Sequence, residues 1–253
     1  MAKFSLCIEP VLEQYDFCDR IKIAAELGYD AIEFWDPSDK DLKKIAETAQ
    51  KNNIKVSICC VNKAWDIRMN FPKDEVIANI KKSVEMAKIL GTKSMIGLSG
   101  DVGENDGKQT EVLVENLKRV SEILEKENIT LCLEALNSLV DHKGYYLDST
   151  KVGFDIINKV NSNNVKLLYD VYHMQIMEGN IIDTINANID AIGHFHSAGV
   201  PGRNEHMNGE NDYHNILKAI DKTSYDKYFG LEYWTTYDAK QSLKDCLTYL
   251  RGE

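Results

Sequence analysis

The chain has 253 residues, close to the roughly 250 residues of a single (β/α)8 barrel. Hydrophobic residues make up 43% and charged residues 28%, which argues against a disordered chain. The net charge of −10 argues against a nucleic-acid partner, because proteins that bind the phosphate backbone usually carry a basic surface.

The sequence contains no apolar run long enough to span a membrane, and its first residues lack the apolar core of a signal peptide. Its six cysteines include no C-x-x-C pair, which argues against a zinc knuckle or a thioredoxin-like motif. We therefore expect a reduced cytoplasmic protein without a membrane partner.

Short apolar runs and segments with helical spacing alternate along the whole chain. The predicted strands span residues 4–8, 31–35, 56–61, 94–98, 130–134, 165–170, 191–196 and 228–232. The predicted helices span residues 15–27, 40–52, 74–90, 111–128, 149–160, 181–188, 212–220 and 240–250. Gly28 and Gly91 follow two of these helices, as glycines at helix C-termini often do. This strict alternation predicts a parallel sheet.

The predicted strands are apolar throughout, which is typical of strands buried on both faces. An open doubly wound sheet usually has fewer strands at this length. No glycine-rich phosphate loop follows the first strand, where Glu9-Pro10 stands instead. We therefore predict an α/β fold with a single TIM-barrel domain over residues 1–253, a parallel eight-stranded barrel with outer helices.

Four predicted strands in the C-terminal half each end in a residue that can bind a metal ion. These residues are Glu134, Asp170, His196 and Glu232. The carboxyl ends of barrel strands meet on one face, which holds the active site. Oxygen and imidazole ligands suit Mn²⁺, Mg²⁺, Co²⁺ or Zn²⁺. The sequence therefore predicts one divalent metal ion, beside a pocket formed by the long segments 62–73, 99–110, 135–148 and 197–211.

Three stretches of this half of the chain resemble hydroxypyruvate isomerases. They are Tyr169-Asp-Val-Tyr-His173-Met-Gln, Val200-Pro-Gly-Arg203 and Gly230-Leu-Glu232-Tyr. Those enzymes belong to the xylose-isomerase-like barrel superfamily, which also holds the ketose 3-epimerases, such as tagatose and psicose epimerases, and endonuclease IV. The resemblance is close over strands five to eight and loose over the first half.

The resemblance implies a metal-dependent isomerase that acts on a small sugar or hydroxy-keto acid through a cis-enediolate. It makes the four strand-end residues the metal ligands, with Glu134 and Glu232 also acting as acid–base carboxylates. His173 and Arg203 would contact substrate oxygens, although His173 could instead orient Asp170. A homodimer is the expectation for this family.

His196 and the segment after the third strand depart from the hydroxypyruvate isomerase pattern. Glutamine is common at the position of His196 in those isomerases, whereas histidine is usual in the epimerases. The isomerases also carry a Gly-Asp-Trp…Gly-Glu-Arg-Gly loop where this chain has Val61-Asn-Lys-Ala-Trp65-Asp-Ile-Arg68. A ketose 3-epimerase is therefore the alternative to a hydroxypyruvate isomerase, and the sequence leaves both open.

Glu33 and Trp65 are further candidates for substrate binding. Glu33 closes the second strand, and it either hydrogen-bonds a ligand or forms an ion pair inside the barrel. Trp65 lies on a long segment, and it either walls the substrate or packs in the core or a lid. His194 shares a strand face with His196, and we expect it to pack below the metal ion.

Two other functions compete with an isomerase. An endonuclease IV-like phosphodiesterase needs a multinuclear zinc site, yet the early strands end without a cluster of histidines. The acidic net charge also argues against it. The full set of potential ligands argues against a non-catalytic sugar-binding barrel.

Overall fold

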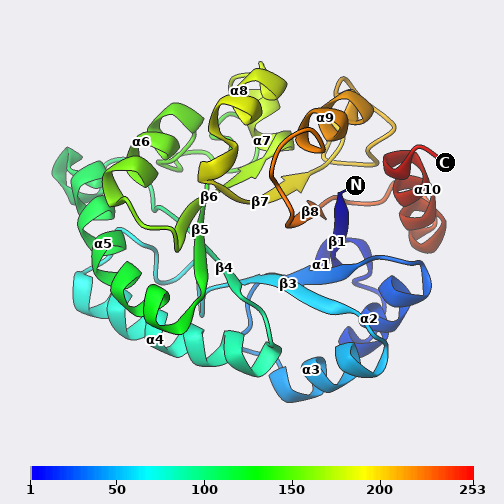
Figure 1. The fold of residues 1–253 in the computed structure, drawn as a ribbon, viewed down its shortest axis with the longest axis horizontal. Helices are drawn as coiled ribbons and strands as arrows, with labels where there is room; N and C mark the ends of the chain where they lie inside the picture. The colour runs from blue at the N-terminus through cyan, green and yellow to red at the C-terminus, as the bar shows by residue number, and fades with distance from the viewer. Residues whose placement is uncertain (1) are drawn as a thin grey trace.

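The computed structural model describes residues 2–253 and forms a closed barrel of eight strands in sequence order. The strands are β1 (Lys3–Cys7), β2 (Ala31–Phe34), β3 (Lys55–Cys60), β4 (Ser94–Gly97), β5 (Thr130–Glu134), β6 (Val165–Asp170), β7 (Ile192–Ser197) and β8 (Tyr228–Leu231). All neighbouring strands pair in parallel, and β8 closes the barrel against β1. Figure 1 shows the helices around the outside of this barrel. The predicted TIM barrel is confirmed.

The predicted helices are present, with ends shifted by a few residues. They are α2 (Phe17–Glu26), α3 (Leu42–Lys51), α4 (Lys73–Leu90), α5 (Gln109–Glu127), α6 (Thr150–Val160), α8 (Ile181–Asn188), α9 (Tyr213–Ile220) and α10 (Ala239–Arg251). Gly28 and Gly91 have φ of 89° and 72°, the left-handed backbone that suits glycine at a helix end.

Four short elements were not predicted from the sequence. They are the helices α1 (Ile8–Val11) and α7 (Val171–Met177) and the 3₁₀ turns η1 (Glu104–Gly107) and η2 (Ile189–Ala191). Helix α7 matters most, because it begins directly at the end of β6. None of the helices in residues 2–253 is long and apolar enough to cross a membrane.

Two register shifts interrupt the barrel. One lies between Ile32 and Glu33 on β2 and leaves Ser57 as an extra residue on β3. The other lies between Leu167 and Leu168 on β6 and leaves Gly193 as an extra residue on β7. Such bulges re-aim the side chains that follow them. The residues aimed in this way include Glu33 and His194.

Candidate active site

A cavity of about 160 Å³ lies at the carboxyl ends of the strands. Its apolar lining consists of Trp35, Cys60, Trp65, Ile96, Leu98, Leu136 and Trp234. Its polar lining consists of Glu134, His142, His196, Arg203 and Glu232. The segments after β3, β5 and β7 therefore contribute Trp65, His142 and Arg203, as expected for long loops at a barrel mouth.

The four predicted metal ligands lie together beside this cavity. Each of Glu134, Asp170, His196 and Glu232 is buried and offers one ligand atom, and these atoms lie within 4.8 Å of one another. Strand register explains the clustering, because Asp170 on β6 pairs directly with His196 on β7. His196 Nδ1 lies 3.2 Å from Glu134 Oε1 and 3.3 Å from Glu232 Oε2.

Asp170 uses its two carboxylate oxygens differently. Oδ1 accepts hydrogen bonds from the backbone N–H groups of Tyr172 at 2.8 Å and His173 at 3.4 Å, so Asp170 caps helix α7. Oδ2 is buried without a hydrogen-bond partner in the described chain. Burial raises the pKa of Asp170 to about 7, against the opposing charges of Arg203 and His196. The cap therefore fixes the carboxylate and leaves one oxygen free for another partner.

His196 is surrounded by carboxylates. Burial alone lowers the pKa of an imidazole, but the charges of Glu232 and Glu33 reverse this effect and raise the pKa of His196 well above its ordinary value. Acceptor oxygens of Glu134 and Glu232 both face Nδ1. A proton on His196, or a cation bound beside Nδ1, relieves the repulsion between the carboxylates that surround this ring.

The carboxylate of Glu232 is held through both oxygens. Trp35 Nε1 donates to Oε1 at 2.5 Å, and Arg203 Nη2 donates to Oε2. Burial raises the pKa of Glu232, but the positive charges of Arg203 and His196 outweigh it and hold the pKa well below its usual range. Glu232 is therefore ionised and fixed in direction.

Arg203 is a buried cation at the cavity wall. Its backbone has φ of 57°, just after Pro201-Gly202, and its side chain turns inward. The guanidinium lies 5.2 Å from the ring centroids of Tyr172 and Trp234. Stacking between two rings fixes a planar guanidinium in a way that a lysine ammonium could not match. Arg203 is therefore not a solvated loop arginine.

His173 is a neutral hydrogen-bond donor behind the cavity. The backbone N–H of Asn137 donates to Nδ1 at 3.1 Å, so Nδ1 is an acceptor and Nε2 carries the proton. Burial and the charge of Arg203 lower the pKa of His173 well below its ordinary value. Nε2 lies 3.4 Å from Asp170 Oδ2, a contact that favours an orienting role toward Asp170.

The two remaining predicted residues lie at different depths. Glu33 is 1% exposed and contacts Nε2 of His194 at 2.8 Å and Nε2 of His196 at 3.0 Å. Its contacts favour the ion pair inside the barrel, and His194 packs below the site as expected. Trp65 is 48% exposed and stacks on His142 with ring centroids 5.5 Å apart. It forms part of the cavity wall.

Trp35, His142 and Trp234 line the cavity but were not predicted as cavity residues from the sequence. Trp35 directly follows β2, and Trp234 lies two residues after Glu232, so their positions near strand ends could have indicated a place at the cavity. His142 gave no such signal, because its place depends on the conformation of a long loop. Glu205 and His206, on the segment after β7, are also buried, although nothing in the sequence pattern singled them out.

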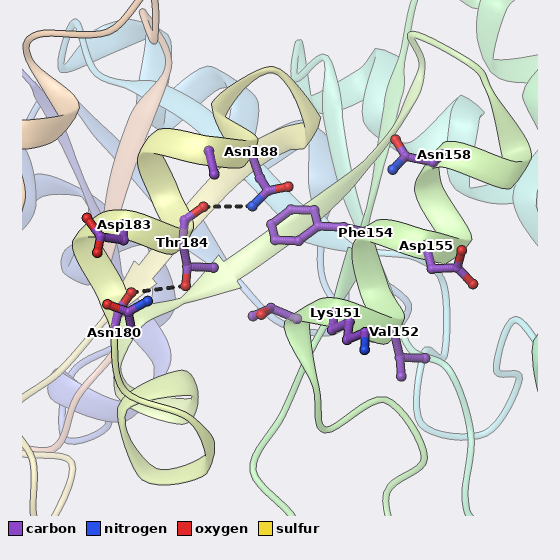
Figure 2. A pocket seen from close by; sticks show the side chains of 11 residues that line it. Lys151, Val152, Phe154, Asp155, Asn158, Asn180, Asp183, Thr184 and Asn188 are labelled. Atoms are coloured by element: carbon purple, nitrogen blue, oxygen red, sulfur yellow. Dashed lines mark hydrogen bonds between the residues drawn. The ribbon is translucent and has the colours of Figure 1, made fainter.

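A larger hollow of about 840 Å³ lies on the outer surface of the barrel. Figure 2 shows it between helices α6 and α8, with Phe154 between them and with hydrogen bonds that link Thr184 to Asn180 and Asn188. Its lining includes no histidine or cysteine. The convergent titratable groups lie in the smaller cavity, so size does not identify the candidate active site here.

The donor set beside the cavity fits a divalent metal ion. It offers three carboxylates and one imidazole, all buried. Asp170 Oδ2 makes no hydrogen bond in the described residues, and it lies 3.4 Å from His173 Nε2 and 3.7 Å from Arg203 Nη2. A closer cation would stabilise a buried carboxylate oxygen of this kind. Oxygen and imidazole donors of this type suit Mn²⁺, Mg²⁺, Co²⁺ or Zn²⁺. These residues could therefore hold such an ion.

Known proteins resemble this chain along nearly all of its length. A family model described as xylose isomerase-like TIM barrel matches residues 21–252. The hydroxypyruvate isomerase of Escherichia coli K12 is 30% identical over 242 residues, which cover 92% of this chain and 93% of that protein.

Two solved structures share the fold. One is described as AP endonuclease, family 2, from Brucella melitensis; it has 25% identity, a TM-score of 0.92 and coverage of 98% of this chain and 99% of that one. The other is D-psicose 3-epimerase from Clostridium cellulolyticum H10, with 19% identity, a TM-score of 0.84 and coverage of 99% and 98%. At this identity, the second likeness concerns the fold alone.

Proposed function

The chain belongs to the xylose isomerase-like TIM-barrel family, and from this premise we propose that it is a metal-dependent isomerase of the hydroxypyruvate isomerase type. Its relationship to a named isomerase makes it an enzyme of the isomerase class, which includes epimerases. The observation that carries the proposal is the convergence of Glu134, Asp170, His196 and Glu232 beside one cavity.

Those four residues would hold one divalent ion, which would supply Lewis acidity to the carbonyl of an α-hydroxy carbonyl substrate. Asp170 suits this role because its free Oδ2 is fixed by the cap on α7. His196 suits it because Nδ1 faces Glu134 and Glu232. We propose Mn²⁺, Mg²⁺, Co²⁺ or Zn²⁺ as candidates.

The two glutamates would carry the proton transfer. One carboxylate removes the proton from the carbon next to the carbonyl, and the C–H electron pair becomes the C=C bond of a cis-enediolate. The other glutamate, in its protonated form, would give a proton to the neighbouring carbon while the hydroxyl proton passes to the former carbonyl oxygen, which moves the carbonyl. Both side chains line the cavity, and Glu232 is already ionised by its contacts with Arg203 and Trp35.

Negative charge that develops on the substrate oxygens would lie near Arg203. Its guanidinium is fixed in advance by the rings of Tyr172 and Trp234, so little reorganisation accompanies the charge development. The Nε2–H of His173 is a second fixed donor on the same side, beside Asp170. These contacts support a role for Arg203 and His173 in stabilising the enediolate, with His173 acting through Asp170.

The cavity favours a small substrate without a phosphate group. The small volume of the cavity, about 160 Å³, supports a small hydroxy-keto compound or sugar as the substrate. Arg203 is the one lysine or arginine in its lining, and Glu232 already pairs with it. A phosphorylated sugar would find no free cation among these lining residues.

A ketose 3-epimerase is the second candidate, and His196 is the residue that favours it. In that reaction the proton returns to the opposite face of the same carbon. Incubation with hydroxypyruvate, ketoses and ketose phosphates, each with Mn²⁺, Mg²⁺ or Co²⁺, followed by NMR identification of the product, separates the two. A shifted carbonyl supports the isomerase, and an inverted hydroxyl supports the epimerase.

An endonuclease IV-like phosphodiesterase has less support. In residues 2–253 the candidate metal clusters are the four-residue set and Glu33–His194–His196, and both include His196. Elemental analysis of the purified protein tests this point: one ion per chain supports the isomerase, and three support a nuclease. A cytoplasmic location and a homodimer stay predictions, and analytical ultracentrifugation tests the second.

Loss of solvent deuterium exchange in two variants tests the proposed mechanism. Glu134→Gln and Glu232→Gln should abolish exchange at the α-carbon of the substrate while circular dichroism stays that of the wild type. Glu122→Gln, an exposed change on α5, is the matched control and should exchange normally. Unchanged exchange in both site variants would contradict the mechanism.

A further inference from the structure

A second polar cluster lies inside the barrel, directly beneath the candidate metal site. Glu33 stands at its centre, and His194 and His196 are each 2% exposed. Glu33 Oε2 contacts His194 Nε2 at 2.8 Å and accepts a hydrogen bond from Ser57 Oγ at 3.2 Å. Glu33 Oε1 lies 3.0 Å from His196 Nε2. The two oxygens of one carboxylate therefore face two histidines.

The contact between Glu33 and His196 joins two atoms that lack other partners. Both Glu33 Oε1 and His196 Nε2 are buried, and neither makes a hydrogen bond within the described residues. They form an ion-pair contact at 3.0 Å, in which an imidazole N–H and a carboxylate oxygen attract each other. The opposite nitrogen of the same ring, Nδ1, faces Glu134 and Glu232.

Three local features of the backbone create this contact. The register shift on β2 lies between Ile32 and Glu33, and the extra residue on β3 is Ser57, which hydrogen-bonds Glu33. The register shift between β6 and β7 lies just before His194. Gly230 on β8 leaves room, because a Cβ there would collide with Glu33 Oε1 and lie 2.9 Å from His196 Cδ2.

We propose that Glu33 is a positioning residue that holds the Nε2–H of His196, so that Nδ1 presents its lone pair to the metal site. A carboxylate on the far nitrogen fixes both the tautomer and the ring orientation of a metal-binding histidine. This inference rests on the proposed function, because it assigns Nδ1 to the metal ion. His194 and Ser57 in turn hold Glu33 in place.

The same three residues do not need a metal ion of their own. Glu33, His194 and His196 offer ligand atoms close enough to share one. However, the 2.8 Å contact of Glu33 Oε2 with His194 Nε2 is a hydrogen bond, and Oε2 also accepts a hydrogen bond from the Ser57 hydroxyl, so this oxygen already has two partners. The four-residue set, by contrast, offers three carboxylates, and three of its members line the cavity.

Glu33→Gln is the decisive variant, because an amide offers one acceptor oxygen and turns an NH₂ group toward the other histidine. The first measurement is Mn²⁺ affinity, from the free Mn²⁺ signal in electron paramagnetic resonance. We expect a loss of about 10- to 100-fold. Glu33→Asp keeps the charge and should recover part of this loss, and Glu122→Gln, the exposed change on α5, should match the wild type.

The second measurement does not depend on metal binding. In protein labelled with ¹⁵N-histidine, the wild type should show a solvent-protected Nε2–H signal of His196 with and without metal, assigned by comparison with His196→Gln. Glu33→Gln should lose that protection while its thermal unfolding stays cooperative. If Glu33→Gln does not fold, Glu33→Asp decides, with reduced protection as the expected result.

The outcomes separate this inference from the proposed function. Unchanged Mn²⁺ affinity together with an unchanged Nε2–H signal in Glu33→Gln overturns the inference. Two Mn²⁺ ions per wild-type chain also overturn it, because Glu33 would then be a ligand. A wild type that binds no Mn²⁺ but keeps a Glu33-dependent Nε2–H signal contradicts the proposed function and retains the positioning role.

Discussion

Trp35 and Glu232, which lie 197 positions apart in sequence, meet at the wall of the cavity through a hydrogen bond of 2.5 Å from the indole N–H to Oε1. Trp35 directly follows β2, and Glu232 directly follows β8. The bond therefore spans β1, the strand that lies between these two in the barrel. A neutral donor on one oxygen and Arg203 on the other together set the direction of this carboxylate.

Trp35→Phe should lower kcat/KM by about 10- to 100-fold, because a hydrogen bond to a charged group is worth about 1.5–3 kcal/mol. The aromatic wall persists in this variant, so the substrate should still bind. Steady-state kinetics with the substrate identified by the screen measure the effect. Trp65→Phe is the control, because Trp65 is 48% exposed and forms part of the cavity wall. This substitution should change KM more than kcat. Equal effects of the two variants would contradict the assignment of Trp35.

Arg203→Lys should lower kcat/KM even though the positive charge is kept. The lysine ammonium cannot stack between Tyr172 and Trp234, so it loses the fixed direction toward Glu232. Urea unfolding should also show a loss of stability, since a buried carboxylate then lacks a well-placed partner. Arg119→Lys on α5, where the arginine side chain is 56% exposed, should leave both measurements unchanged. Wild-type kinetics in Arg203→Lys would show that catalysis does not depend on the fixed direction of the guanidinium toward Glu232.

His206 should make the protein less stable as the pH falls below about 6.5. Burial lowers the pKa of His206 from 6.5 to about 3, so between these values the unfolded chain binds a proton that the folded chain does not. The contribution of His206 to the free energy of unfolding is therefore constant above pH 6.5 and decreases as the pH drops toward 3. At pH 5 the loss amounts to about 2 kcal/mol, at 1.36 kcal/mol per pH unit.

Urea unfolding at pH 7.5 and pH 5 measures this effect. In His206→Gln, which can still donate to Ser197, the difference in unfolding free energy between the two pH values should shrink by about 2 kcal/mol. His214→Gln changes an exposed histidine and should keep the wild-type difference. An unaltered difference in His206→Gln would show that this side chain is protonated in the folded protein.

Gly199→Ala should impair the site from a distance. A Cβ at Gly199 would lie 2.5 Å from the backbone oxygens of Glu205 and Asn208, which cannot rotate away as a side chain can. The segment that carries Arg203 would have to open, so kcat/KM and the melting temperature should both fall. Gly153→Ala is the matched control, because its Cβ meets Leu167 Cδ1, the mobile end of a side chain. Its kcat/KM should match the wild type.

The sequence was sufficient for the architecture and for the four strand-end residues. The predicted strands 130–134 and 165–170 coincide with β5 and β6, because continuous apolar runs followed by turn residues have few other interpretations. Glu134 and Asp170 could be placed on one face because all strand ends of a parallel barrel meet there.

The sequence was not sufficient for contacts that depend on loops. Helix α7 was missed because Asp170 was interpreted as a ligand, whereas one oxygen of the same side chain also caps a helix of seven residues. The stacking of His142 on Trp65 joins two long segments whose paths follow no periodic pattern. The contact of Glu33 with His196 depends on register shifts, which change side-chain direction without a clear signature in composition.

The tryptophans of the cavity wall determine where the intrinsic fluorescence of the protein originates. The chain contains three tryptophans, and all three, Trp35, Trp65 and Trp234, line the cavity. Indole emission therefore originates entirely at the site of substrate entry, with no background from the rest of the barrel. The unlabelled protein carries its own fluorescent probe of whether this chamber is filled.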